Sequence, residues 1–398
     1  MHVNLPPMGW NSWNTFGSEI NEKVVMESAD VLAESGLRDA GYNYLVIDDH
    51  WHLKERGADG RMVPDPEKFP HGMKYVADYI HSKGLKFGMY TCSGYLTCGG
   101  HPGSYDNEWL DAQTFAEWEV DFLKYDFCFY PKTVRSDIFY KRIRLALSNC
   151  GRDILFSACT AGLNNSKQWI REAAPDMWRS SADINDSWQS IRETAEGQLM
   201  AQEYNVKGSF NDMDMLVVGM NGKGNVGFKG CTTEEYKTHF SLWALLNSPL
   251  MIGCDIREMD DAAKAILMNR DVIAVNQDPK CSLPFFANNF IWKANQARKS
   301  DSEPHFEKYP LDVPIIAKYL DNGDIAVGVF NFMDEAATRW QMTLTCDNLG
   351  LPLNCGKTFE AHDLWTGETV RPFNGTLMID HLEPHACRLF RLKIVDKE

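Results

Sequence analysis

The feature that most constrains the fold is a regular alternation of short apolar runs with longer helix-forming stretches. The runs are rich in β-branched and aromatic residues, and they lie at 7–10, 44–48, 86–91, 122–126, 154–159, 177–182, 209–213 and 250–253. Between them are amphipathic stretches such as 22–40 and 73–83. Eight strands alternating with helices predict an α/β fold, the (β/α)8 TIM barrel. A doubly wound sheet is disfavoured because no GxGxxG motif follows the first strand.

The pattern changes near residue 283. The later runs are short and alternate apolar with polar residues, as at 324–332, 339–344 and 386–393, and the turn Asp321-Asn322-Gly323 precedes the first of them. Long amphipathic helices no longer occur. We therefore predict a catalytic barrel over 1–282 and a C-terminal antiparallel β-sandwich domain over 283–398.

Charge and cysteine usage exclude several classes of protein. The 40 Lys and Arg against 55 Asp and Glu give a net charge of −15, which argues against a nucleic-acid partner. No apolar run approaches the roughly 20 residues that span a bilayer, so no membrane partner is expected. The first residues do not resemble a signal peptide, which predicts a cytoplasmic protein, or a secreted or periplasmic one if a leader has been removed.

The eleven cysteines contain no CxxC pair, which excludes zinc-ribbon and thioredoxin spacings.

Acidic residues follow several of the predicted strands. In a barrel of this kind the strand ends meet at one face, so these side chains are expected to share a pocket. Each Asp alone could instead cap a loop or helix. Carboxylates beside a Lys, an Arg and aromatic rings fit a sugar, because carboxylates bind hydroxyls and two of them can cleave a glycosidic bond. The residues concerned are Asp48, Asp49, Lys124, Asp126, Arg179, Asp183, Asp212 and Asp214.

Two other kinds of site are weaker interpretations. Asp49, His50 and His52 have a spacing that could bind a metal, because alternate residues of an extended segment share a side. No further His-rich element accompanies them, and strand-end histidines are often plain hydrogen-bond partners. A serine nucleophile is disfavoured because the chain has no GxSxG turn. We therefore predict neither a metal nor a cofactor.

Six motifs in order closely resemble glycoside hydrolase family 27, the α-galactosidases and α-N-acetylgalactosaminidases. Together they span the barrel and its exit, and such an ordered set is far more specific than any one motif. They are Met8-Gly9-Trp10-Asn11-Ser12-Trp13, Asp48-Asp49-His50-Trp51, Lys124-Tyr125-Asp126-Phe127-Cys128, Trp178-Arg179-Ser180-Ser181-Ala182-Asp183-Ile184, Asn211-Asp212-Met213-Asp214-Met215 and Val275-Asn276-Gln277-Asp278-Pro279.

The resemblance implies a role for each matching residue. Asp126 matches the nucleophile and Asp183 the general acid/base of a retaining enzyme, whose carboxyls should lie roughly 5–5.5 Å apart. Lys124 is expected to lower the pKa of Asp126, because a positive charge stabilises the carboxylate. Asp183 is expected to lie where its charged form is less stable, because a general acid must be protonated near neutral pH. The alternative for Asp126 is a structural pair with Lys124.

The resemblance also implies residues that bind the sugar. Asp48 and Asp49 match the pair that holds the 4- and 6-hydroxyls, and Trp10 matches an aromatic wall. Further sugar contacts are implied for Tyr90, Cys98, Lys124, Thr160, Arg179 and Asp214.

The cysteines also follow the family in part. Cys98 and Cys128 match a disulfide that joins the loop after the third strand to the nucleophile strand. A second family disulfide is absent, and His50 occupies a position where the family often has a cysteine. Whether Cys98 and Cys128 are oxidised stays open.

One departure bears on the substrate. Many α-galactosidases have Cys-Glu-Trp after the fifth strand, where this chain has Cys159-Thr160-Ala161. Small residues there resemble the N-acetylgalactosaminidase branch, whereas the short pair Asp48-Asp49 disfavours the β-L-arabinopyranosidase branch. We predict a retaining exo-α-galactosidase acting on an oligosaccharide or glycoconjugate, with those two activities as alternatives. A non-catalytic sugar-binding protein is disfavoured because both Asp126 and Asp183 are present. Self-association into a homo-oligomer stays open.

Overall fold

The computed structural model describes residues 3–287, 312–352 and 354–397. Its contacts divide the chain into two compact units. The first comprises Met1–Thr232 with Asn247–Arg270, and the second comprises Thr233–Leu246 with Asp271–Glu398. The predicted domain boundaries, 1–282 and 283–398, stay a prediction, because a division by contacts does not decide which segments fold independently.

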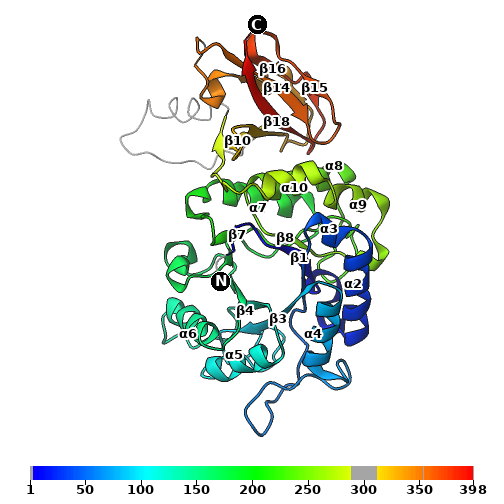
Figure 1. Cartoon of the computed structure of the whole chain (residues 1–398), viewed down its shortest axis with the longest axis vertical. Helices are drawn as coiled ribbons and strands as arrows, with labels where there is room; N and C mark the ends of the chain where they lie inside the picture. Colours follow the sequence, from blue (N-terminus) through cyan, green and yellow to red (C-terminus); the bar gives the residue numbers. More distant parts are fainter. Residues whose placement is uncertain (1–2, 288–311, 353, 398) are drawn as a thin grey trace. The chain divides into compact units, whose positions relative to one another are not determined.

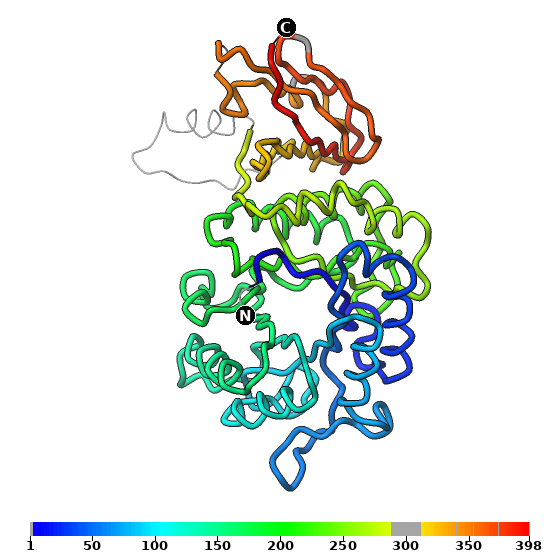
Figure 2. The backbone as a smooth tube through the Cα atoms, in the orientation of Figure 1, coloured from blue at the N-terminus to red at the C-terminus, as the bar shows by residue number. Residues whose placement is uncertain are grey.

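The first unit is built on eight parallel strands in the order β7-β6-β5-β4-β3-β2-β1-β8. A single bridge between Leu216 and Ile252 links the β7 side to β8, and the Leu216 amide donates to the Met251 carbonyl at 2.7 Å. The predicted TIM barrel is therefore confirmed (Figures 1 and 2). The strands are β1 (Met8–Asn11), β2 (Tyr44–Val46), β3 (Lys86–Cys92), β4 (Phe122–Asp126), β5 (Leu155–Cys159), β6 (Met177–Arg179), β7 (Phe210–Asp212) and β8 (Leu250–Ile252).

Helices follow the strands and, in Figure 1, lie outside the ring that the strands form. The predicted helix over 22–40 is wrong in its length. It breaks into α2 and α3 at Gly36, whose φ of +91° ends the helical run and favours glycine. The helices of this unit are α1 (Trp13–Phe16), α2 (Glu22–Glu34), α3 (Leu37–Ala40), α4 (Gly72–Ser82), α5 (Glu108–Glu117), α6 (Ser136–Ser148), α7 (Trp188–Leu199) and α9 (Asp261–Leu267).

Burial explains why the strands read as continuous apolar runs. Every residue of β1, β5 and β8 is buried, as expected for a parallel sheet covered on both faces. Packing between neighbouring strands is close enough to require glycine at position 9, where a Cβ would lie 2.3 Å from the Tyr44 carbonyl oxygen. The packed core therefore fixes the positions of the strand ends, which carry the candidate site residues.

The second unit contains a sheet of antiparallel strands in the order β15-β14-β18-β11-β10-β9, and two further strand pairs, β12-β17 and β13-β16. This confirms the predicted β-sandwich. The strands are β9 (Phe285–Phe286), β10 (Ile315–Tyr319), β11 (Ile325–Phe330), β12 (Ala337–Thr338), β13 (Thr343–Thr345), β14 (Lys357–Asp363), β15 (Thr369–Val370), β16 (Thr376–Met378), β17 (His381–Leu382) and β18 (Cys387–Asp396).

Two helices complete this unit, α8 (Thr233–Leu245) and α10 (Arg270–Asn276). Trp365 donates from Nε1 to the Ser241 hydroxyl at 3.0 Å, which ties α8 to the segment that follows β14. The predicted strand over 339–344 is wrong at its start, where Arg339–Gln341 forms a 3₁₀ turn and only then does β13 begin. Among the described residues, no helix is both long and apolar enough to cross a membrane.

Candidate active site

The residues predicted to form a site all lie at the carboxyl ends of the barrel strands. The strands run parallel, so their ends share one face of the barrel. Trp10 lies in β1, Asp48 and Asp49 after β2, Tyr90 in β3, Lys124 and Asp126 in β4, Thr160 after β5, Arg179 at the end of β6, Asp183 beyond it, and Asp214 after β7.

Lys124 is the central cation of this face. Its Nζ lies 2.7 Å from Asp48 Oδ2, which also accepts a hydrogen bond from Asn11 Nδ2 at 2.9 Å. Burial alone would lower the pKa of Lys124, but the carboxylates of Asp48 and Asp126 outweigh burial and raise that pKa above its ordinary value. Lys124 therefore stays charged. Asn11 was not predicted as a site residue, although its place at the end of the first strand is the signal that could have found it.

Asp126 lies at the end of β4, where three groups contact its carboxylate. Tyr90 donates from its hydroxyl to Oδ2 at 2.9 Å, the Phe127 amide donates to Oδ1 at 2.8 Å, and Cys98 Sγ lies 3.6 Å from Oδ2. Burial raises the pKa of Asp126, and Lys124 only partly opposes this effect. Lys124 lowers the pKa of Asp126 as expected, but the cost of burying the carboxylate is larger, so the net pKa is raised and not lowered.

Asp183 stands in a different environment. Its side chain is 85% exposed, and Oδ1 lies 2.7 Å from Arg179 Nη2. The other Arg179 nitrogen, Nη1, lies 2.9 Å from Asp214 Oδ1, and Asp214 Oδ2 accepts from the Ile184 amide at 2.8 Å. The surrounding protein displaces part of the water near the carboxylate, which would raise the pKa of Asp183, but Arg179 outweighs this partial desolvation and the pKa is lowered. The expected raised pKa at Asp183 is therefore wrong.

Trp10 and Thr160 are almost completely buried, whereas a side chain that contacts a sugar directly would be expected to have some exposed surface. The Trp10 ring has no exposed surface, and its Nε1 donates to the Cys254 carbonyl at 2.9 Å. Thr160 is 2% exposed, and its hydroxyl lies 3.5 Å from the Arg179 carbonyl oxygen. Their roles as an aromatic wall and as the neighbour of the 2-hydroxyl stay predictions, as do the sugar contacts of the other residues and the separation of the Asp126 and Asp183 carboxyls.

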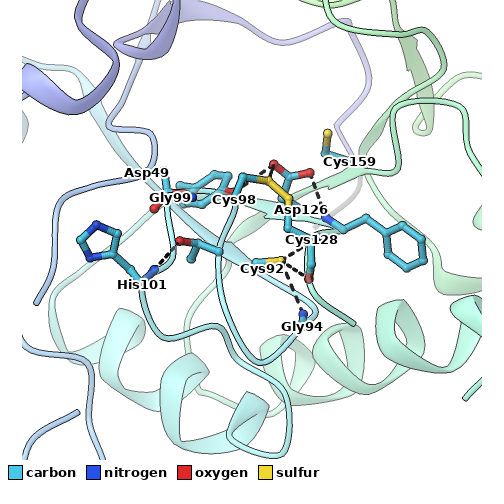
Figure 3. Close-up of a disulfide and its surroundings, with 12 residues drawn as sticks. Asp49, Cys92, Gly94, Cys98, Gly99, His101, Asp126, Cys128 and Cys159 are labelled. Atoms are coloured by element: carbon cyan, nitrogen blue, oxygen red, sulfur yellow. Dashed lines mark hydrogen bonds between the residues drawn. A yellow bond between two sulfur atoms is a disulfide. The ribbon is translucent and has the colours of Figure 1, made fainter. Parts of the chain in front are cut away.

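Cys98 and Cys128 form a disulfide that joins the loop after β3 to the end of β4 beside Asp126 (Figure 3). The thiol of Cys92 lies next to this bridge. Its sulfur accepts from the Cys128 amide at 3.0 Å and lies 3.2 Å from the Cys128 carbonyl oxygen. The other nine cysteines, all within the described part of the chain, form no disulfide. The single bridge therefore stiffens the backbone on which Asp126 is carried.

The histidines of the Asp49 segment do not converge on a common point with its carboxylate. His50 Nδ1 lies 3.0 Å from His101 Nε2, and His52 Nε2 lies 3.0 Å from the Pro102 carbonyl oxygen. Asp49 itself accepts from the backbone amides of His50 and Gly99. The arrangement favours hydrogen-bonding histidines over a metal site at Asp49, His50 and His52. Sequence reasoning missed His101, because nothing in a single chain links it to a residue 51 positions earlier.

Comparison with known proteins gives consistent matches along the chain. A sequence model for the family described as Alpha galactosidase A matches residues 5–278, and one for the Alpha galactosidase C-terminal beta sandwich domain matches residues 312–392. An α-galactosidase of Cyamopsis tetragonoloba is 40% identical over 388 residues, which cover 97% of this chain and 86% of the relative.

Solved structures of similar proteins share the whole architecture. α-Galactosidase I from Mortierella vinacea superposes with a TM-score of 0.86 at 32% identity, covering 98% of this chain and 97% of that one. An α-galactosidase from Saccharomyces cerevisiae, solved with raffinose, gives a TM-score of 0.83 at 26% identity and covers 98% of both chains.

Proposed function

Because the chain belongs to the α-galactosidase family, glycoside hydrolase family 27, and is a glycoside hydrolase, we propose that it removes terminal α-D-galactosyl residues with retention of configuration. The proposed substrates are oligosaccharides or glycoconjugates, and the raffinose in the structure of the Saccharomyces cerevisiae relative supports this class. The observation that carries the proposal is the contrast between Asp126 and Asp183. Asp126 is enclosed by fixed donors, whereas Asp183 is exposed in the segment that follows β6, two strands away from β4 in the sheet.

In the first step Asp126 attacks the anomeric carbon of the galactosyl unit. A bond forms between a carboxylate oxygen and C1, the glycosidic C1–O bond breaks, and Asp183 gives its proton to the departing oxygen. Tyr90 and the Phe127 amide orient the attacking carboxylate, because both donate to its oxygens. The product of this step is a galactosyl ester of Asp126.

In the second step Asp183, now ionised, takes a proton from water while the water oxygen attacks C1. The ester bond to Asp126 breaks, and galactose leaves with the configuration of the substrate. Arg179 suits this step, because it stabilises the ionised form of Asp183. Lys124, charged between Asp48 and Asp126, stabilises the carboxylate that is released.

The pKa directions predict an acidic pH optimum that depends on Arg179. Catalysis needs Asp126 ionised and Asp183 protonated, yet the pKa of Asp126 is raised and that of Asp183 is lowered. The productive form is then a minor one, and its population is largest between the two pKa values. Replacing Arg179→Gln raises the pKa of Asp183, so the acid limb of the kcat/KM profile and the optimum should move to higher pH.

The measurement is a pH profile of kcat/KM for a p-nitrophenyl α-D-galactoside. Arg192→Gln is the matched control, because Arg192 forms a half-buried ion pair with Glu196 within α7. The control should reproduce the wild-type profile. An optimum that does not move in Arg179→Gln, although activity remains measurable, contradicts the electrostatic argument.

Substrate preference tests the proposed activity directly. With purified protein and a panel of p-nitrophenyl glycosides, kcat/KM should be highest for the α-D-galactoside and lower for the α-N-acetylgalactosaminide and the β-L-arabinopyranoside. For the arabinopyranoside Asp48 and Asp49 are the reason, because a sugar without a hydroxymethyl group offers this buried carboxylate pair one donor fewer. Faster hydrolysis of the N-acetylgalactosaminide would instead make Thr160 decisive and overturn the assignment.

A further inference from the structure

Asp49 is oriented by backbone amides from two different loops. The His50 amide donates to Asp49 Oδ1 at 2.8 Å, and the Gly99 amide donates to Oδ2 at 2.8 Å. The carboxylate is almost completely buried. The His50 bond lies within the segment after β2, whereas the Gly99 bond can form only if that segment and the loop at 97–102 keep one fixed separation.

An imidazole pair joins those same two segments. His50 Nδ1 and His101 Nε2 lie 3.0 Å apart, with the ring centroids 4.8 Å apart and the rings nearly perpendicular. Trp13 stacks on His50 at a centroid distance of 6.2 Å. A Cβ at Gly99 would lie 2.4 Å from His50 Nε2, so only glycine lets the second loop come this close to the ring.

Each partner of the pair is anchored in its own segment. The His101 amide donates to Thr97 Oγ1 at 3.1 Å, and the Thr97 amide donates to the His101 carbonyl at 2.7 Å. Lys68 Nζ donates to the His50 carbonyl at 3.0 Å. Figure 3 shows Gly99 and His101 in the same loop, with Asp49 beside Gly99. A hydrogen bond between the two rings therefore fixes the distance between the segments.

We propose that His50 and His101 are positioning residues for Asp49, and that their imidazole hydrogen bond holds the loop at 97–102 where the Gly99 amide reaches the Asp49 carboxylate. The inference rests on the proposed function, in which Asp49 binds a galactose hydroxyl. The histidines act through Asp49, so their effect is on substrate affinity and on the pH at which that affinity is lost.

The chemistry of the pair sets the direction of the pH effect. As long as at least one ring is neutral, an N–H of one ring can donate to the lone pair of the other. When both rings are imidazolium ions, an N–H of one ring faces an N–H of the other and no hydrogen bond can form. Burial, with His101, Lys68 and Lys54, lowers the pKa of His50, and the carboxylate of Asp49 opposes this. His52, buried with its pKa lowered to about 3, and Arg56 face the pair from the same segment. The bond persists through neutral pH and is lost at acid pH.

The test compares His101→Leu with His101→Gln. Leucine removes the hydrogen bond, so KM for the galactoside should rise about tenfold at neutral pH while kcat changes less than about twofold, as expected when binding shared by ground and transition states is lost. Glutamine carries both a donor and an acceptor, so KM should stay near the wild-type value. In wild type KM should rise at a pH below the ordinary imidazole range, because the second ring is protonated only below the lowered pKa of His50, and this rise should be absent in His101→Gln. His381→Gln, at an exposed histidine that pairs with Glu383, is the control.

Hydrogen–deuterium exchange separates this proposal from the proposed function. Peptides that contain the Gly99 amide, the donor that reaches Asp49 from the second loop, should exchange faster in His101→Leu and at the wild-type rate in His101→Gln. If wild type hydrolyses no α-galactoside, the proposed function falls, and the exchange rates still decide whether the pair positions Asp49. Unchanged exchange in His101→Leu, or an unchanged KM with only a lower Tm, overturns the proposal.

Discussion

Replacing Asp126→Asn is expected to lower kcat/KM for α-galactosides by roughly 10⁴-fold or more, because an amide cannot form the ester with the anomeric carbon. The fold should be retained. Asparagine keeps an oxygen for the Phe127 amide and a group within reach of the Tyr90 hydroxyl, and it removes a charge that burial already disfavours. The Tm should therefore stay equal to or above that of wild type.

Azide distinguishes the role of nucleophile from other losses of activity. In Asp126→Gly, where the whole side chain is removed, azide can occupy the space of the carboxylate, restore turnover of an activated galactoside and yield a galactosyl azide of inverted anomeric configuration. Asp255→Asn is the matched control, because the Asp255 carboxylate, although it follows β8, pairs with Arg257 rather than with Lys124 or Arg179, and it should retain activity. A variant at Asp126 with near-wild-type kcat would remove this residue from the mechanism.

Loss of the Cys98–Cys128 disulfide is expected to have the largest effect on stability. The bridge closes a loop with a sequence separation of 30 residues, which is worth about 3–4 kcal/mol on the chain-entropy model. The Tm of a double Cys→Ser variant should fall by roughly 5 °C, since each kcal/mol shifts the Tm of a protein this large by little more than about 1 °C. Activity should fall as well, because Cys98 Sγ lies 3.6 Å from the Asp126 carboxylate.

The comparison needs two readouts and one control. Thermal unfolding gives the Tm of wild type with and without reductant, and a thiol titration in denaturant should find nine free thiols before reduction and eleven after it. Cys355→Ser changes an exposed cysteine outside the bridge and should leave the Tm unchanged. Eleven thiols without reductant, together with an unchanged Tm, would show that the bridge does not form in solution.

The barrel was predictable because its strands are bounded by sharp local signals. The predicted strand at 122–126 agrees with β4 at both ends, and the other seven differ by a few residues. Strand residues buried on both faces form continuous apolar runs, and the polar residues that follow mark the carboxyl ends. Because parallel strands end at one face, the same signals were enough to assign Asp48, Asp126 and Asp214 to that face of the barrel.

What the sequence could not show depends on contacts between distant or competing groups. The run at 339–344 looked like a strand, but Gln341 Oε1 accepts from the Thr338 amide at 2.9 Å and closes a local turn first. The pKa of Asp183 depends on where the Arg179 side chain points, which periodicity does not reveal. The His50–His101 pair joins two loops whose separation is set by tertiary packing.

The course of the chain through its two units limits how such proteins can be recombined. The chain leaves the first unit at Thr232, gives α8 to the second, returns at Asn247 for β8 and α9, and leaves again at Arg270. Within the second unit, α8 donates from Thr238 Oγ1 to the His385 carbonyl at 2.7 Å and accepts from Trp365 at Ser241. A chimera that exchanges only the sandwich sequence therefore separates it from its own helix. A transplant that preserves these bonds must carry 233–246 together with 271–398, as a cassette with two insertion points.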